Sequence, residues 1–192
     1  MSSSPADRRA RRGAAPRRRH TRAISLTLGG ALLTAGTILV AAALLAPQAV
    51  EKTYGDVKTA VIQQVDQVRQ DVFSELPSVA LGVRGGIAEL DRCDGTFTEM
   101  LSYERDGVPP VWAAHNNCGG DVTLGWETGQ HIRIVGDEQV YEVIDIRYTS
   151  KIWSSTDDLV GLGGDLALQT CFYGEDRMKF VGLAPLPVAA SP

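Results

Sequence analysis

The sequence has few of the residues from which metal sites and cofactor sites are built. It contains three cysteines and three histidines in 192 residues. It has no C-x-x-C, no H-E-x-x-H, no EF-hand spacing and no phosphate-binding glycine loop. We therefore expect no metal and no cofactor, so any chemistry must come from a small number of side chains.

Positive charge is also scarce beyond residue 22. Residues 1–22 contain eight arginines and one acid, whereas the remainder carries 11 basic and 22 acidic residues. A nucleic-acid-binding domain carries its positive charge on the folded surface, so we expect no nucleic acid among the partners. Residues 1–22 are mostly Ser, Ala, Pro and Arg, which predicts a disordered basic tail in the cytoplasm.

Residues 23–46 contain no charged side chain over 24 positions. A helix of this length extends about 36 Å, enough to cross a hydrocarbon core of ~30 Å. Arginines precede it directly, and positive flanks stay in the cytoplasm. The pattern predicts a single-pass transmembrane helix in the lipid bilayer of the cell membrane, with the following domain extracellular. A cleaved signal peptide is the alternative, although its apolar core is shorter, ~7–15 residues.

Residues 47–78 show the period of an amphipathic helix that serves as a stalk. Apolar residues recur three or four positions apart, at Val50, Tyr54, Val57, Val61, Val65, Val68 and Val72. We expect Pro77 to end this helix. Two interpretations stay open. A stalk that packs its valine stripe on the following domain is favoured, because the heptad breaks after Val61; a dimerising coil is the alternative.

From about residue 79 the apolar period changes to two. The segments "QHIRIVG" and "QVYEVIDIRYT" alternate, and "DLALQTC" and "RMKFVGLAPL" are apolar runs separated by a glycine-containing turn. Several short strands without a clear helix predict a mainly β domain at 79–187, a small antiparallel barrel or sandwich. Residues 188–192 are predicted to be a frayed tail.

The three cysteines lie in the segment expected outside the membrane, where disulfides form. Cys93 in "DRCDG" and Cys118 in "NNCGG" occupy polar, glycine-containing loops, which can approach each other. A Cys93–Cys118 disulfide is favoured, and it leaves Cys171 free. A Cys118–Cys171 bridge, or three reduced thiols, remain alternatives.

A free external thiol predicts a nucleophile if it has an acid–base partner and a nearby cation. His115 ends the apolar run "VPPVWAAH" and opens a polar loop, so it is the candidate partner. His131 lies within an alternating strand and is expected to face solvent. Arg177 follows Cys171 by six residues and begins the next strand.

The segment "LALQTCFYGEDRMKFVGLAPL" resembles the C-terminal signature of sortases, the membrane-anchored cysteine transpeptidases of Gram-positive cells. In that family a strand ends in a threonine–cysteine pair, and an arginine opens the next strand; here these are Thr170, Cys171 and Arg177. The segment "VWAAHN" resembles the earlier strand that ends in the family's histidine, here His115.

The resemblance implies a small sortase-like β-barrel preceded by the transmembrane helix and the stalk. It implies that Cys171 attacks the C-terminal sorting motif of secreted substrate proteins, that His115 transfers protons, and that Arg177 stabilises the oxyanion. The thioester would then pass to a cell-wall precursor or pilin amine. Ala114 and Asn116 replace the family's usual glycine and arginine, which indicates a divergent or minimal member. A catalytically inactive sortase-like binding or scaffold domain, and an unrelated anchored β domain with a structural disulfide, are the alternatives.

Overall fold

The computed structural model describes residues 36–38, 40–41 and 43–187, and the chain divides into two units, Met1–Leu45 and Ala46–Pro192. The described residues of the first unit are helical. The predicted tails at 1–22 and 188–192 lie outside the described residues, as does most of the predicted span at 23–46. In the part of the chain that the structure describes, no helix has the length and apolar character needed to cross a membrane.

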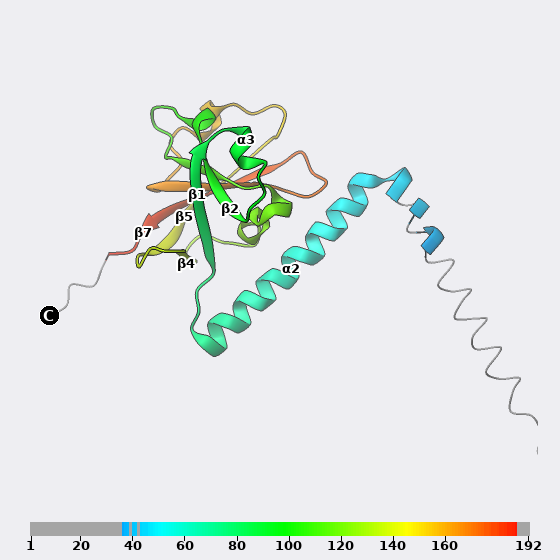
Figure 1. The fold of residues 1–192 in the computed structure, drawn as a ribbon, viewed down its shortest axis with the longest axis horizontal. Helices are drawn as coiled ribbons and strands as arrows, with labels where there is room; N and C mark the ends of the chain where they lie inside the picture. The colour runs from blue at the N-terminus through cyan, green and yellow to red at the C-terminus, as the bar shows by residue number, and fades with distance from the viewer. Residues whose placement is uncertain (1–35, 39, 42, 188–192) are drawn as a thin grey trace, which may run out of the picture. The chain divides into compact units, whose positions relative to one another are not determined.

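The second unit consists of a long helix followed by seven strands with short helical turns between them (Figure 1). The strands are β1 (Ser78–Gly85), β2 (Thr96–Met100), β3 (Val111–Ala113), β4 (His131–Ile134), β5 (Val140–Thr149), β6 (Leu166–Cys171) and β7 (Met178–Pro185). The α-helices are α2 (Pro47–Phe73) and α3 (Ile87–Leu90), and the 3-10 turns are η1 (Leu101–Tyr103), η2 (Asn116–Cys118), η3 (Gly120–Thr123) and η4 (Thr156–Leu159).

The seven strands form one closed barrel in the order β1-β2-β3-β6-β7-β5-β4. The mainly β fold expected from the alternating segments is therefore confirmed. The expectation of a purely antiparallel arrangement was wrong, because β1 pairs in parallel with both β2 and β4, and β3 pairs in parallel with β6. Parallel neighbours need a crossover connection. The segment containing α3 returns the chain between β1 and β2, and β3 and β6 are separated by two intervening strands.

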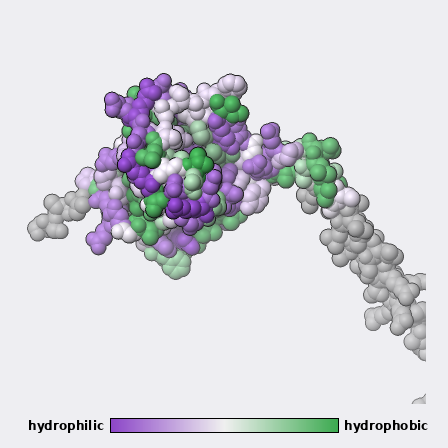
Figure 2. Space-filling view, turned by 45° about the horizontal axis from the view of Figure 1, so that its top comes forward, coloured by the Kyte–Doolittle hydropathy of each residue, from purple (hydrophilic) through white to green (hydrophobic). Residues whose placement is uncertain are grey.

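The strands bury side chains on both of their faces. The inner face forms the main core, which includes Phe97, Leu168 and Val181. A second, smaller core lies on the outer face of β3, β6 and β7, and comprises Val111, Leu159, Leu162, Ala167 and Phe180. Elsewhere hydrophilic residues are interleaved with hydrophobic ones on the face that Figure 2 presents. The smaller core matters for function because the free cysteine lies on that side of the sheet.

Helix α2 packs on the barrel with a side that adjoins its valine stripe, and Tyr54 of the stripe lies edge-on to the ring of Tyr173, with centroids 5.6 Å apart. Gly55 is buried there, and the ring of Tyr173 fills the space that a side chain at this position would need. Gln63 Nε2 donates to the carbonyl oxygen of Gly125 at 3.0 Å. The expectation that the valine stripe packs on the domain was wrong for its six valines, which are 37–65% exposed, whereas Tyr54 does contact the barrel. The helix also ends at Phe73, four residues before Pro77.

Candidate active site

Cys171 ends β6 as a free, partly buried thiol on the outer face of the sheet. Gln169 shares that face two residues earlier, and its Nε2 donates to the Cys171 Sγ at 3.7 Å. Across the ladder Cys171 pairs with Met178, which packs against the smaller core. The thiol therefore lies at the edge of a buried apolar surface rather than in open solvent.

The pairing of β3 with β6 brings His115 to the same place. Ala113 is in register with Gln169, and the Ala114 N–H donates to the Gln169 carbonyl oxygen at 3.1 Å. Continued by two residues, this register sets His115 opposite Cys171. Residues two apart on a strand share a face, so the imidazole and the thiol belong to the same outer face at adjacent strand ends.

His115 has a carboxylate partner that sequence reasoning missed. Its Nε2 lies 2.8 Å from Asp91 Oδ1, and the imidazole is 41% exposed. Asp91 follows α3, 24 positions before the histidine, and no local pattern distinguishes it from other surface acids. The pair engages Nε2, which leaves Nδ1 as the ring nitrogen for proton transfer.

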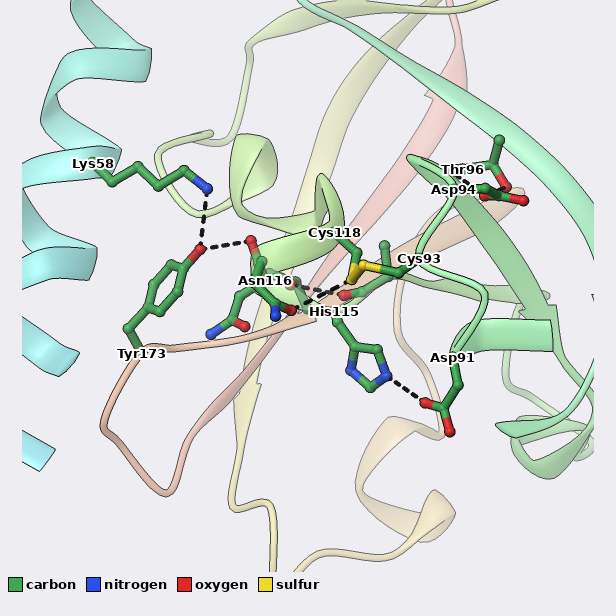
Figure 3. Close-up of a disulfide and its surroundings, with 12 residues drawn as sticks. Lys58, Asp91, Cys93, Asp94, Thr96, His115, Asn116, Cys118 and Tyr173 are labelled. Atoms are coloured by element: carbon green, nitrogen blue, oxygen red, sulfur yellow. Dashed lines mark hydrogen bonds and ion pairs between the residues drawn. A yellow bond between two sulfur atoms is a disulfide. The ribbon is translucent and has the colours of Figure 1, made fainter. Parts of the chain in front are cut away.

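A disulfide connects the two loops that carry this pair (Figure 3). Cys93 and Cys118 are bonded with their Cα atoms 4.9 Å apart, so the bridge predicted from the loop composition is confirmed. The Cys118 N–H donates to the His115 carbonyl oxygen at 2.9 Å, and Cys93 lies two residues after Asp91. The bridge therefore holds the histidine and its carboxylate in alignment.

Replacing both bridge residues, Cys93→Ser with Cys118→Ser, is expected to lower the free energy of unfolding by about 3 kcal/mol, because the bridge closes a 25-residue loop in the unfolded chain. Urea unfolding of the full chain in detergent measures the change. Cys171→Ser is the control, since it removes a thiol without opening a loop. Equal unfolding midpoints for the double variant and the unchanged protein would contradict this expectation.

Arg177 does not reach the thiol in this structure. Its guanidinium stacks 3.8 Å from the ring centroid of Phe172 and pairs with Glu175 at 2.9 Å. The Phe172 N–H donates to the Arg177 carbonyl oxygen, so these two residues are cross-strand partners, next to the Cys171–Met178 pair. Neighbouring residues on a strand point to opposite faces, which places Arg177 on the other side from the sulfur.

Lys151 is the cation that acts on the thiol instead. Its Nζ donates to the carbonyl oxygen of Phe172, the residue after Cys171, at 2.9 Å. Burial raises the pKa of the Cys171 thiol, while the charge of Lys151 and the hydrogen bond from Gln169 offset part of this effect. The thiol is therefore neutral at rest. Lys151 stands in "TSKIW", where no sequence pattern marks it as a site residue.

The pH dependence of alkylation tests this arrangement. Only the thiolate reacts, so the raised pKa predicts that iodoacetamide modifies Cys171 with an inflexion at higher pH than it does a free cysteine. Lys151→Met removes a positive charge that favours the thiolate, and the inflexion should move higher still. Arg133→Met, on β4, removes one charge elsewhere and serves as the control. Modification rates are read by intact mass. An inflexion below that of free cysteine, or one unmoved by Lys151→Met, would refute the assignment.

A small polar cluster ties α2 to both loops of the site (Figure 3). The Tyr173 hydroxyl lies 2.7 Å from the Asn116 carbonyl oxygen and 3.0 Å from Asp121 Oδ2. Lys58 Nζ on α2 lies 2.5 Å from the same carboxylate oxygen, which is buried. Asn116 follows the histidine directly, and Tyr173 follows the cysteine by two positions. Helix α2 thus braces the segments that position both reactive groups.

A cavity of about 480 Å³ borders the smaller core, and neither Cys171 nor His115 is among its lining residues. Its lining includes Arg84, Glu99, Tyr103, Glu104, Arg105 and Val111. Tyr103 links it to the sulfur, because burial and, secondarily, negative charge on Cys171 raise the pKa of Tyr103 to about 12. Both acidic and basic side chains face the cavity, and Val111 at its edge belongs to the smaller core. Within the described ranges, no cluster of three metal-binding side chains is present.

No protein-family model matches the sequence, and no curated protein matches it. The fold is similar to those of solved sortases. Sortase A of Listeria monocytogenes shares 14% identity at a TM-score of 0.36, over 56% of this chain and 82% of that one. Sortase C-1 of Actinomyces oris shares 20% at 0.41, over 56% and 68%, and sortase C of Clostridium perfringens SM101 shares 18% at 0.38, over 56% and 63%. Similarity at this level assigns no role to any residue, so function must be argued from the chain's own site.

Proposed function

We propose that this protein is a membrane-anchored, sortase-like cysteine transpeptidase. The observation that carries the proposal is the β3–β6 register, which, continued by two residues beyond Ala113 and Gln169, would set His115 opposite the free Cys171 on the face that carries the smaller core. A peptide-sized cavity borders that core. A thiol, an imidazole and a neighbouring groove are the minimum that acyl transfer through a thioester requires.

The reaction begins when the neutral Cys171 thiol gives its proton to His115 and the sulfur attacks a substrate carbonyl carbon. The tetrahedral intermediate collapses, the C–N bond breaks, and His115 returns the proton to the leaving amine. The remaining thioester is attacked by a second amine, whose proton passes through His115 to the departing sulfur. Asp91 holds the imidazole in position during both transfers.

The developing oxyanion needs a positive or hydrogen-bonding partner. Two cations contact Phe172, the residue that follows the cysteine. Lys151 bonds the Phe172 carbonyl, and Arg177 stacks on the Phe172 ring. We assign the oxyanion to Arg177, whose guanidinium must first leave Glu175 and Phe172 on substrate binding and move to the face of the thiol. Lys151 is the cation that already acts on the sulfur.

The substrates we propose are secreted proteins with a C-terminal sorting motif, and the acceptor is a cell-wall precursor or pilin amine. Residues 23–46 would anchor the enzyme in the membrane with residues 47–192 outside. The uncharged stretch behind an arginine-rich tail supports this orientation. The Cys93–Cys118 disulfide supports it independently, because such bonds persist in oxidising compartments.

The test is to incubate the full chain, in detergent, with a library of sorting-motif peptides and primary amines. A thioester on Cys171, seen as a peptide-sized mass increase that hydroxylamine removes, supports the proposal. A catalytically inactive binding domain is the second candidate, favoured by the engagement of Arg177 with Phe172 and Glu175. That candidate predicts peptide binding at the cavity without any covalent adduct.

A further inference from the structure

The valine stripe of α2 is the largest apolar feature that the barrel leaves uncovered on this helix. Its seven members are 37–65% exposed. An adjoining side of α2 contacts the barrel through Gly55, Lys58 and Gln63, and Tyr54 of the stripe packs edge-on against the ring of Tyr173 with centroids 5.6 Å apart. The helix is therefore fixed in a position where the six valines of the stripe stay exposed.

The stripe follows a strict 11-residue repeat. Each member has a counterpart eleven positions away: Val50 with Val61, Val61 with Val72, Tyr54 with Val65, and Val57 with Val68. Eleven residues complete about three turns of an α-helix, so such a stripe runs almost straight along the helix. Repeats of this kind pack helices against each other over their whole length. The break in the heptad after Val61 is a consequence of this longer repeat.

The charges that border the stripe are complementary across a two-fold axis. Arg69 lies on one edge, and Asp71 lies on the other edge at nearly the same height. In a parallel, in-register pair of helices, each Arg69 would face Asp71 of the second copy. An antiparallel pair centred near Val61 would instead bring Arg69 close to Glu51 of the second copy, which lies on the same edge. The proposed membrane anchor favours the parallel arrangement, because two chains held in one membrane by residues 23–46 begin their α2 helices at the same height.

The composition of α2 argues against a lipid surface as the occupant. The helix carries four acidic and three basic residues, whereas helices that lie on anionic membranes are rich in Lys and Arg. Pairing two stripes would remove on the order of 1,000 Å² from water, which is where specific interfaces begin.

We propose that the valine stripe is a dimerisation surface whose occupant is α2 of a second copy of this chain, in parallel and in register. The dimer is a property of α2 and does not depend on the transpeptidase activity. It uses the valines that the barrel leaves exposed, so the contacts of α2 with its own barrel stay in place.

Single cysteines introduced into the full chain test this geometry. The chain carries Cys171→Ser to remove the free thiol and is reconstituted in vesicles of phosphatidylglycerol and phosphatidylethanolamine. Val68→Cys places a thiol on the stripe, and Gln70→Cys places one at a similar height about 200° around the helix. With copper phenanthroline as oxidant, we expect Val68→Cys to form disulfide-linked dimers at least tenfold faster than Gln70→Cys.

The second part of the experiment exchanges the charges of Arg69 and Asp71 at the two edges of the stripe. Arg69→Asp should slow crosslinking through Val68→Cys several-fold, and adding Asp71→Arg should restore it. Equal rates for the stripe and control cysteines would overturn the proposal. A stripe cysteine that neither crosslinks nor reacts with a water-soluble maleimide would place the stripe in lipid, and one that reacts but does not crosslink would leave it facing solvent or another protein. Either result would also overturn it.

Discussion

Replacing Cys171 with alanine is expected to abolish the thioester and to lower transpeptidation by a factor on the order of 10⁶, the scale of losing an enzyme nucleophile. Neither of the other two cysteines can take its place, since Cys93 and Cys118 are joined in the disulfide. Intact mass after incubation with peptide and amine measures the adduct, and product formation measures the rate.

Cys171→Ser is the matched variant, because it keeps a side chain of similar size against the smaller core while replacing the sulfur. Both variants should unfold close to the unchanged protein, so a lost adduct would report chemistry rather than folding. A peptide adduct that persists in Cys171→Ala would place the nucleophile elsewhere. Binding without an adduct in the unchanged protein would favour the scaffold alternative.

Replacing His115 with alanine is expected to reduce transpeptidation by about 10²–10⁴-fold, the usual contribution of a positioned acid–base group. The reason is that a thiol kept neutral by burial must lose its proton as it attacks, and the leaving amine must gain one. Steady-state rates with a fixed peptide and amine measure the loss. Added imidazole should recover part of the activity, because it restores proton transfer without restoring the side chain.

Asp91→Asn provides the comparison for His115. An amide still accepts a hydrogen bond from the ring, but it carries no charge to stabilise an imidazolium, so a smaller loss is expected. Imidazole should not rescue this variant. A loss below tenfold for His115→Ala, or equal rescue of both variants, would remove the histidine from the mechanism.

Local patterns were enough to predict the mainly β domain and to select candidate site residues near strand ends. The alternating segments anticipated β4 and β5, and the two apolar runs anticipated β6 and β7. Apolar runs that lead into polar loops marked Cys171 at the end of β6 and His115 just after β3. That the two ends adjoin depends on the parallel β3–β6 pairing, which joins segments more than fifty residues apart. Turn spacing alone suggested a purely antiparallel sheet, and so it missed the crossovers.

The charged partners of His115 and of the thiol, Asp91 and Lys151, could not be predicted from the sequence, for a physical reason. Asp91 and Lys151 act through tertiary neighbours, one across a disulfide-linked pair of loops and the other through the backbone of Phe172. Arg177 was chosen for its spacing from Cys171. The hairpin register then turned its side chain to the opposite face, where Phe172 and Glu175 hold it. The number of residues between Cys171 and Arg177 predicts that they lie close together, but the β6–β7 register decides which face of the sheet each side chain occupies.

The valine stripe shows a different limit. Periodicity correctly predicted an amphipathic helix over most of 47–78, but it could not say which side would meet the barrel. Gly55 decided this, because the absence of a side chain lets the Tyr173 ring approach the helix backbone more closely than valines would allow.

The disulfide between Cys93 and Cys118 also bears on when the proposed active site is fully assembled. Reductants in the cytosol keep such sulfurs apart, so a newly made chain would carry a histidine whose loop is not yet fastened to that of Asp91. With the proposed extracellular placement and activity, maturation would wait for export, and peptides inside the producing cell would be spared from a half-assembled enzyme.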